Sequence, residues 1–435
     1  MTYKLSLTTA IFINLNIMLG SGIFINAVPL SYKAGFLGSF AYIIVGILIL
    51  PLMASIAELT RFHPSGGLYT FGAKELHPFI GFVSSWSYFI SKLSSSAIMI
   101  HISTIFLQTC IPSLNNLPVL AINTFIVALF VAFNMLNIQV NSIIQKIFLA
   151  TKIVPLVVTI LLGARYFSAH TLSVSAHNIT PLLGTLPLVL YAVLGFEAAC
   201  SISNSIINPR RNGPLAIFIS YALVICSAFT YQFFVYGSIG TMLTAHHSYQ
   251  NVLPLLLSQS TVFSSTTMTS WIIGILHILI ALSALGGTYS IFFSNLWNLY
   301  TLAQNKHLPF SRALTFMNKH HIPPLPVLIE GIFVISYLII AQGDHIILQC
   351  ISALGMLISY TISVFSLIAY YQRIDAPTAQ YALPLCSLVS CAILASSVLA
   401  YLWHLGFALF IFSFILALGI FFFYITHSRT SSSQQ

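Results

Sequence analysis

Long apolar runs, separated by short polar stretches, fill almost the whole chain. A transmembrane helix requires about 20 predominantly apolar residues, and the sequence contains twelve runs of about that length or longer. They lie at about 6–31, 36–59, 80–107, 118–137, 146–167, 183–206, 214–240, 269–300, 325–341, 346–371, 381–402 and 404–426. We therefore predict an all-α membrane protein with twelve transmembrane helices, embedded in a lipid bilayer.

The composition and the distribution of charge support this prediction. The chain is 58% hydrophobic and 5% charged, whereas soluble proteins are about 25% charged. If the N-terminus is cytoplasmic, eleven of the 15 Lys and Arg residues fall in cytoplasmic segments and two fall outside, as the positive-inside rule requires. We predict a multi-pass protein of the plasma (inner) membrane with both termini in the cytoplasm and a short tail at 427–435. The net charge of +9 then needs no nucleic-acid partner.

Two of the predicted helices contain residues that should interrupt them. Gly20, Ser21 and Gly22 lie in the middle of the first run, and Gly195 followed by Glu197 lies in the sixth. Lipid offers no hydrogen-bond partners to a freed backbone, so a break survives only where it lines a cavity or packs against protein. Each break therefore indicates a binding site.

The spacing of the two breaks indicates an internal repeat. Five predicted helices separate them, so they occupy corresponding positions in two five-helix halves. This pattern is typical of inverted-repeat secondary transporters, whose substrate site lies between the breaks. We predict a single transmembrane domain with repeats at about 6–167 and 183–371 and two appended helices at about 381–426.

The chemistry of a broken helix predicts what it binds. The amides at the start of the second half-helix are unpaired and lie at the positive end of the helix dipole. We expect the amides near Ser21, Gly22 and Ile23 to hold a substrate carboxylate, and carbonyls at the ends of the preceding half-helices to hold an ammonium group. Those carbonyls are near Met18 and around Tyr191, Ala192 and Leu194. An α-amino acid carries both charges on one carbon.

Five stretches, in the expected order, carry a family resemblance. They are 18–24, 64–69 followed by 78–82 and Trp86, 191–197, 208–214 and 302–309. Together they resemble the amino acid/polyamine/organocation (APC) superfamily of transporters. The resemblance implies an amino acid permease that works by alternating access, through proton-coupled symport or amino acid exchange, with no enzymatic activity and no cofactor.

Two ionisable residues beside the predicted breaks are candidates for coupling or gating, because charges within a membrane are costly and usually functional. Burial favours the protonated form of Glu197, which suits a proton-linked gate; the alternative is a structural hydrogen bond between the broken helices. The resemblance implies that the ammonium of Lys152 takes the place of a sodium ion found in related transporters. The alternative is a lysine that snorkels to the cytoplasmic interface.

A third ionisable residue, Lys92, lies about three turns into the third predicted helix. It belongs to a mainly polar face whose members recur at helical spacing. They are Tyr88, Lys92, Ser95, Ser96 and Met99. By resemblance this face borders the substrate side chain, where a cation would disfavour cationic substrates. Alternatively, Lys92 pairs internally with a carboxylate such as Glu197.

Three positions depart from the family pattern. Trp297 stands where many members have arginine, and Asn305-Lys306 replaces an acidic-glycine pair. Thr288 replaces the gating aromatic of some exchangers, and we expect it to contact the substrate. The identity of the substrate therefore does not carry over. The alternatives are a polyamine or organocation exchanger and an amino acid sensor that does not transport. The 14 histidines form no metal-ligand spacing, so we expect no metal site.

Overall fold

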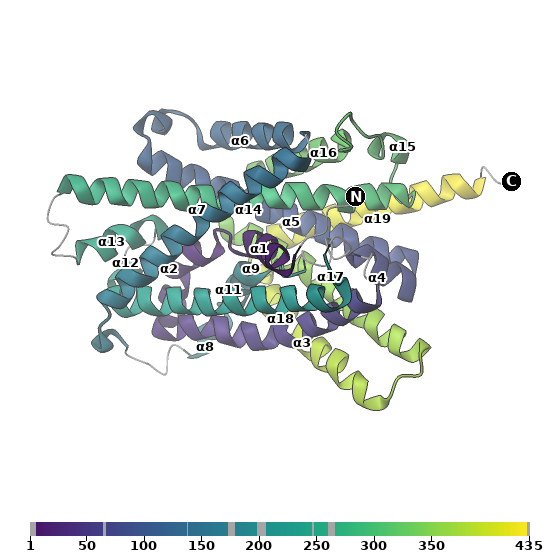
Figure 1. Ribbon diagram of the computed structural model, residues 1–435, viewed down its shortest axis with the longest axis horizontal. Helices are drawn as coiled ribbons and strands as arrows, with labels where there is room; N and C mark the ends of the chain where they lie inside the picture. Colours follow the sequence, from purple (N-terminus) through teal and green to yellow (C-terminus); the bar gives the residue numbers. More distant parts are fainter. Residues whose placement is uncertain are drawn as a thin grey trace.

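A computed structural model describes residues 6–63, 67–136, 138–172, 179–197, 206–245, 248–259 and 266–432. The regular elements in these ranges are α-helices and short 3₁₀ helices (Figure 1). Most long helices run along the long axis of the molecule, with α4, α15 and the C-terminus at one end and α12 and α13 at the other.

The first part of the chain contains α1 (Leu7–Met18), α2 (Gly22–Ala34), η1 (Gly35–Ser39), α3 (Phe40–Phe62), α4 (Leu68–Glu75), α5 (Pro78–Cys110), η2 (Pro112–Asn116), α6 (Val119–Asn134), α7 (Ile138–Arg165) and η3 (Ala169–Thr171). The second part contains α8 (Ile179–Leu183), α9 (Leu186–Val193), α11 (Pro209–Ile239), α12 (Met242–Ala245), η6 (Tyr249–Asn251), α13 (Val252–Ser258), α14 (Thr266–Gln304), α15 (Ser311–Leu314), α16 (Pro324–Ala341), α17 (His345–Arg373), η7 (Thr378–Tyr381), α18 (Ala382–His404) and α19 (Gly406–Ser432).

Each predicted apolar run contains a helix, although the first is divided between α1 and α2, and the described helix of the sixth, α9, covers only Leu186–Val193. Helix α7 begins at Ile138 rather than near residue 146, and residues 198–205 of the sixth run lie outside the described part of the chain. Among the described residues, eight helical segments are long and apolar enough to cross a membrane by length and composition. The all-helical membrane architecture is confirmed, whereas the number of twelve spans and the inverted repeat stay predictions.

Both predicted helix breaks are present. Helix α1 ends at Met18 and α2 begins at Gly22, so the residues between them leave the helical ladder. Helix α9 ends at Val193, and Gly195 has φ +120°, a conformation that glycine adopts without the steric penalty of a side chain. The glycines at both positions therefore end helices that hydrophobicity alone would have continued.

Helix α5 lies inside the molecule, where hydrogen bonds join it to α17. Ser94 Oγ donates to the Leu348 carbonyl at 2.8 Å, and Ser359 Oγ donates to the Ser84 carbonyl at 2.6 Å. Small residues such as serine allow helix backbones to approach closely, and their hydroxyls bond across the interface. These contacts fix the position of α5 beside the two breaks.

Candidate functional site

The two helix breaks and α5 meet at a small internal cavity. It is lined by Ile17, Met18, Gly20, Gly22, Lys92, Ser95, Met99, Tyr191, Ala192, Leu194 and Ile291. Most of the predicted binding residues are therefore brought together at one place. The cavity volume is about 20 Å³, which is room for roughly one water molecule.

The glycines let the two breaks touch. A Cβ atom on Gly22 would lie 2.7 Å from Ala192 Cα, and one on Gly195 would lie 3.2 Å from Met18 Cγ. The first of these contacts is with backbone, which cannot move aside as the end of a flexible side chain can. The close approach therefore requires glycine at position 22.

The start of α2 presents backbone donors beside the cavity. The amides of Phe24 and Ile25 both bond the Ser21 carbonyl at 3.0 Å. The amides of Gly22 and Ile23 thus precede the hydrogen-bonded ladder, where a helix leaves its first donors without intrahelical partners. They are the donors expected to receive an anionic group.

Two asparagines tie the broken helices together. Asn14 Nδ2 donates to the Phe196 carbonyl at 3.1 Å and to Ser220 Oγ at 2.6 Å. Asn26 Nδ2 donates to the Leu188 carbonyl at 2.7 Å. Helix α1 is thereby joined to the second break, and α2 is joined to α9. Neither residue is among those predicted from the sequence, although an amide side chain in a helix this apolar is a signal that could have indicated them.

Lys152, on α7, forms hydrogen bonds with the backbone at the first break. Its side chain is buried, and its ammonium donates to the Leu19 carbonyl at 2.9 Å and to the Asn16 carbonyl. The ammonium therefore binds carbonyls at the first break and does not extend to the membrane interface, as the snorkelling alternative would require. A tethered cation satisfies carbonyls that the end of α1 would otherwise leave without partners.

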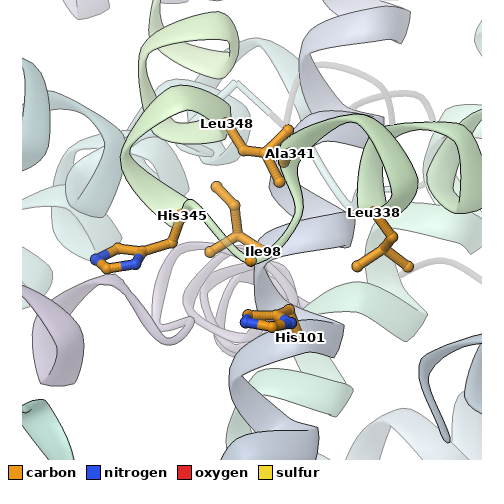
Figure 2. A pocket seen from close by; sticks show the side chains of 7 residues that line it. Ile98, His101, Leu338, Ala341, His345 and Leu348 are labelled. Atoms are coloured by element: carbon orange, nitrogen blue, oxygen red, sulfur yellow. The ribbon is translucent and has the colours of Figure 1, made fainter. Parts of the chain in front are cut away.

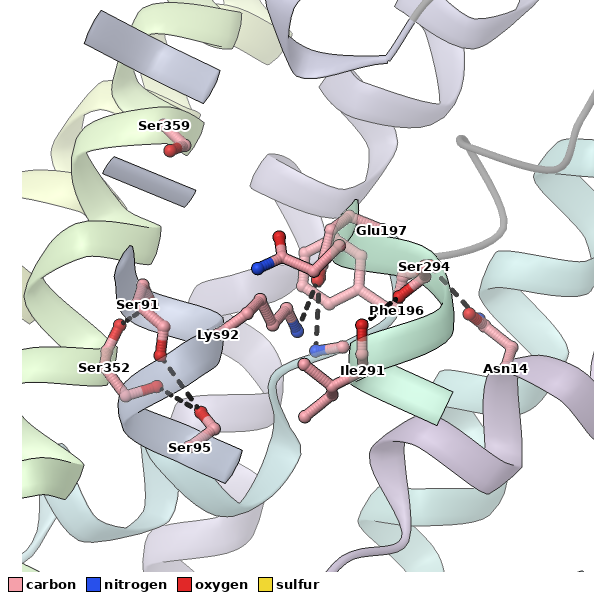
Figure 3. Close-up of polar contacts among 12 residues, drawn as sticks. Asn14, Ser91, Lys92, Ser95, Phe196, Glu197, Ile291, Ser294, Ser352 and Ser359 are labelled. Atoms are coloured by element: carbon pink, nitrogen blue, oxygen red, sulfur yellow. Dashed lines mark hydrogen bonds and ion pairs between the residues drawn. The ribbon is translucent and has the colours of Figure 1, made fainter. Parts of the chain in front are cut away.

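Lys92 and Glu197 form a buried ion pair beside the cavity (Figure 3). The distance from Lys92 Nζ to Glu197 Oε1 is 2.7 Å, and the two side chains are 6% and 1% exposed. The other carboxylate oxygen accepts from the Tyr360 hydroxyl at 2.6 Å and from the Gly195 amide at 3.1 Å. Of the two alternatives for Lys92, internal pairing is the arrangement present, and Lys92 lines the cavity as well.

Comparison with known protein families identifies the class of protein. A family model described as amino acid permease matches residues 5–434, which is nearly the whole chain. The chain belongs to the amino acid permease family. The predicted membership of the APC superfamily is thereby confirmed, and the family identifies the chain as an integral membrane transporter.

Two relatives of this permease are each named an uncharacterized transporter. One, from Mycobacterium tuberculosis, is 25% identical over 410 residues, which cover 90% of this chain and 85% of the relative. The other, from Legionella pneumophila, is 26% identical over 370 residues, which cover 81% of this chain and 76% of the relative. Both names agree with the transporter class.

Five predicted binding residues of the permease do not line the cavity. They are Ser21, Ile23, Tyr88, Ser96 and Thr288, and all five are buried. The Tyr88 ring centroid lies 5.3 Å from Lys92 Nζ, so this residue flanks the ion pair. Within the described part of the chain, the hydroxyls of Ser96 and Thr288 have no hydrogen-bond partner.

Three further residues at the site were not predicted. Tyr360 comes from α17, which no sequence signal connected with the second break, and Ile17 and Ile291 are ordinary apolar positions of membrane helices. Whether these residues reach the site depends on which helices are neighbours.

A second cavity of about 10 Å³ lies near the C-terminal ends of α5 and α16 and the start of α17 (Figure 2). Two histidines, His101 and His345, line it together with Ile98, Leu338, Ala341, Gly343 and Leu348. It contains none of the predicted site residues. Across the described ranges, no group of three or more His, Cys, Asp or Glu side chains is arranged to hold a metal ion.

Proposed function

We propose that this permease carries small, neutral α-amino acids across the membrane by alternating access and exchanges one for another. The observation that supports the proposal is the meeting of two helix breaks at one cavity. One break offers helix-start amides and the other offers helix-end carbonyls, so the site has partners for both charges of a zwitterion.

The head group of the substrate would bind to backbone atoms. The amides of Gly22 and Ile23 would receive the carboxylate at the positive end of the α2 dipole. The ammonium group would bind carbonyls near Met18 and around Tyr191, Ala192 and Leu194. Backbone groups fixed in rigid half-helices need no reorganisation on binding, which lowers the cost of association.

The side chain of the substrate would be neutral and small. Lys92 is the charged residue that lines the cavity, and Glu197 already compensates its charge. The remaining wall near α5 and α14 is formed by Ser95, Met99 and Ile291. Because methionine is flexible, Met99 can move to admit a short side chain, whereas an arginine, a lysine or a polyamine would place a second cation beside Lys92.

Exchange is favoured over proton-coupled symport by the way the buried charges are satisfied. The Glu197 carboxylate accepts from three donors, and the Lys152 ammonium donates to two carbonyls. Each charge is compensated by protein groups without an additional proton. Symport is the second candidate, because two titratable side chains beside the breaks could couple to protons. The position of the Lys152 ammonium among the α1 carbonyls disfavours sodium coupling.

Counterflow tests the proposal. Purified protein in liposomes loaded with an unlabelled amino acid should take up labelled alanine, serine or glycine against the gradient of unlabelled substrate. Arginine, lysine and putrescine should not exchange. The absence of exchange for every amino acid would refute transport and support a sensor. Selective exchange of the cationic compounds would instead identify a polyamine or organocation exchanger.

A further inference from the structure

The segment that connects α14 to α16 has features that the proposed transport site does not use. Helix α14 ends at Gln304 and α16 begins at Pro324, and both helices belong to candidate membrane spans. Residues 305–323 therefore lie where the chain leaves and re-enters the membrane. The segment bonds α4 through Tyr69 and His307, at 2.7 Å, and lies at the same end of the molecule as α4 and the C-terminus (Figure 1).

The segment is strongly basic. Lys306, Arg312 and Lys319 are all exposed, and residues 305–323 contain no Asp or Glu. Exposed acidic residues are also few in the rest of the chain. All six acidic residues of the chain are described, and the exposed ones are Asp344 and Asp375. A second copy of this chain therefore offers little negative surface to these three cations.

Two phenylalanines of the same segment are also exposed. Phe310 is 81% exposed and Phe316 is 65% exposed. Phe310 also has φ +57°, a left-handed conformation that is costly for a bulky residue. Strain of this kind persists where the surrounding structure imposes it, and it often marks a functional position. Aromatic side chains are enriched where a protein crosses the boundary between lipid and water.

The opposite face of the segment is fixed to the protein. Leu308, Leu314 and Ile322 are buried. Asn318 accepts from the amides of His320 and Ile322 at 2.8 and 3.1 Å and donates to the Met135 carbonyl at 3.0 Å. Buried side chains and hydrogen bonds thus fix the segment to the protein, while its two phenylalanines and three cations stay exposed.

We propose that residues 305–323 form a docking surface for anionic phospholipids of the cytoplasmic leaflet. Phe310 and Phe316 enter the boundary between headgroups and acyl chains, and Lys306, Arg312 and Lys319 bind lipid phosphates. Charge complementarity and the position between two membrane spans both favour lipid as the occupant. Juxtamembrane clusters of basic residues bind anionic lipids by this attraction.

Lipid titration of the purified, delipidated protein in detergent tests the proposal without measuring transport. The test variant is Lys306→Gln/Arg312→Gln/Lys319→Gln, and the matched control is Lys74→Gln/Arg210→Gln/Arg211→Gln, which removes three exposed cations elsewhere. The test variant should bind phosphatidylglycerol roughly tenfold or more weakly than wild type. The control should stay within about twofold, because its charges lie outside the proposed surface.

Three further measurements keep the proposal falsifiable. Phosphatidylcholine should bind equally to all variants, and Phe310→Ser should weaken phosphatidylglycerol binding without changing the melting temperature of lipid-free protein. Inorganic phosphate should compete poorly with phosphatidylglycerol. An equal loss of phosphatidylglycerol binding in the test and control variants, or phosphate binding as strong as lipid binding, would overturn the proposal.

Discussion

Gly22 is the residue at which the two broken helices touch. A Cβ atom there would lie 2.7 Å from Ala192 Cα and 2.9 Å from Ala192 Cβ. Gly22→Ala should therefore push the breaks apart and displace the amides proposed to hold the substrate carboxylate. Overpacking of this kind reduces the free energy of unfolding by about 1–3 kcal/mol. We also expect the rate of exchange to fall by about tenfold or more, because small displacements of binding groups slow a reaction strongly.

The matched control for this substitution is Gly274→Ala. Gly274 lies in α14, and a Cβ atom there would meet nothing within 4 Å. This variant should exchange at the wild-type rate and be no less stable, because alanine is the better helix former. Exchange by Gly22→Ala at the rate of Gly274→Ala would show that contact between the breaks is irrelevant to transport.

Lys92 compensates a buried carboxylate, so its removal should destabilise the fold. Lys92→Met leaves Glu197 without its cation, and breaking a buried ion pair from one side costs about 3–5 kcal/mol. The melting temperature of the purified protein should fall clearly. Lys92→Met/Glu197→Gln should recover much of the loss, because the uncompensated charge is gone.

Counterflow with the same variants separates a structural role of Lys92 from a selective one. If the cation excludes basic substrates, the double variant should admit lysine or ornithine that the wild type rejects. An unchanged ranking of substrates would assign Lys92 to structure alone. Equal melting temperatures for Lys92→Met and wild type would contradict the energetic account of the pair.

At the scale of elements, α19 is joined to the end of the molecule that carries α4 through a pair of histidines. The His307 and His427 rings lie 5.3 Å apart and nearly parallel, and Tyr69 of α4 bonds His307. Burial, and to a lesser extent the neighbouring His427, lower the pKa of His307 to about 4. His307 is therefore neutral near pH 7.

The sign of the resulting pH dependence follows from this pKa. An unfolded histidine titrates near pH 6.5, so between about pH 6.5 and 4 the unfolded chain binds a proton at this position that the folded chain does not. The stabilising contribution of neutral His307 is lost as the pH falls through this window. The melting temperature should drop on acidification from pH 7 to 5, and it should drop less in His307→Gln. The exposed residue His404 provides the control: if His404→Gln reduces the drop as much, His307 is not its source.

The helices and their breaks could be predicted from the sequence because a lipid bilayer permits few backbone structures. A membrane span needs a long apolar run, and Gly20, Gly22 and Gly195 interrupt such runs visibly. The neighbours of each helix have no comparable signal. The bond from Tyr360 to Glu197 depends on α17 passing the second break, and the Asn16 and Leu19 carbonyls meet Lys152 because α7 crosses beside α1. Residues of this kind become visible only once the helices are packed.

At the scale of the whole molecule, two polar networks link elements that we expect the proposed alternating access to separate. One is the Lys92–Glu197 pair with Tyr360, which joins α5, the second break and α17. The other, at the end that carries α4, is Glu75, which contacts His63 at 2.7 Å and Arg373 at 3.0 Å. Opening the cavity toward that end would require these contacts to be broken and later remade.

The partners of the two buried charges, Glu197 and Lys152, also predict whether transport is coupled to protons. A coupled proton needs a group whose charge changes between the two orientations of the carrier. Protonating Glu197 would remove its attraction to Lys92, and Lys152 already has carbonyl acceptors. Liposomes with no internal substrate should therefore show little net uptake under an inward proton gradient, whereas preloaded liposomes should exchange rapidly, with or without sodium.

Glu197→Gln distinguishes this expectation from symport. In an exchanger, the variant should lose rate because the ion pair is gone, and the dependence of exchange on pH should match that of the wild type. Net uptake that follows the proton gradient in the wild type and disappears in Glu197→Gln, with exchange retained, would instead identify Glu197 as the proton carrier. That outcome would require Lys92 to release the carboxylate during each cycle, because a protonated carboxyl group is neutral and cannot keep the ion pair with the ammonium.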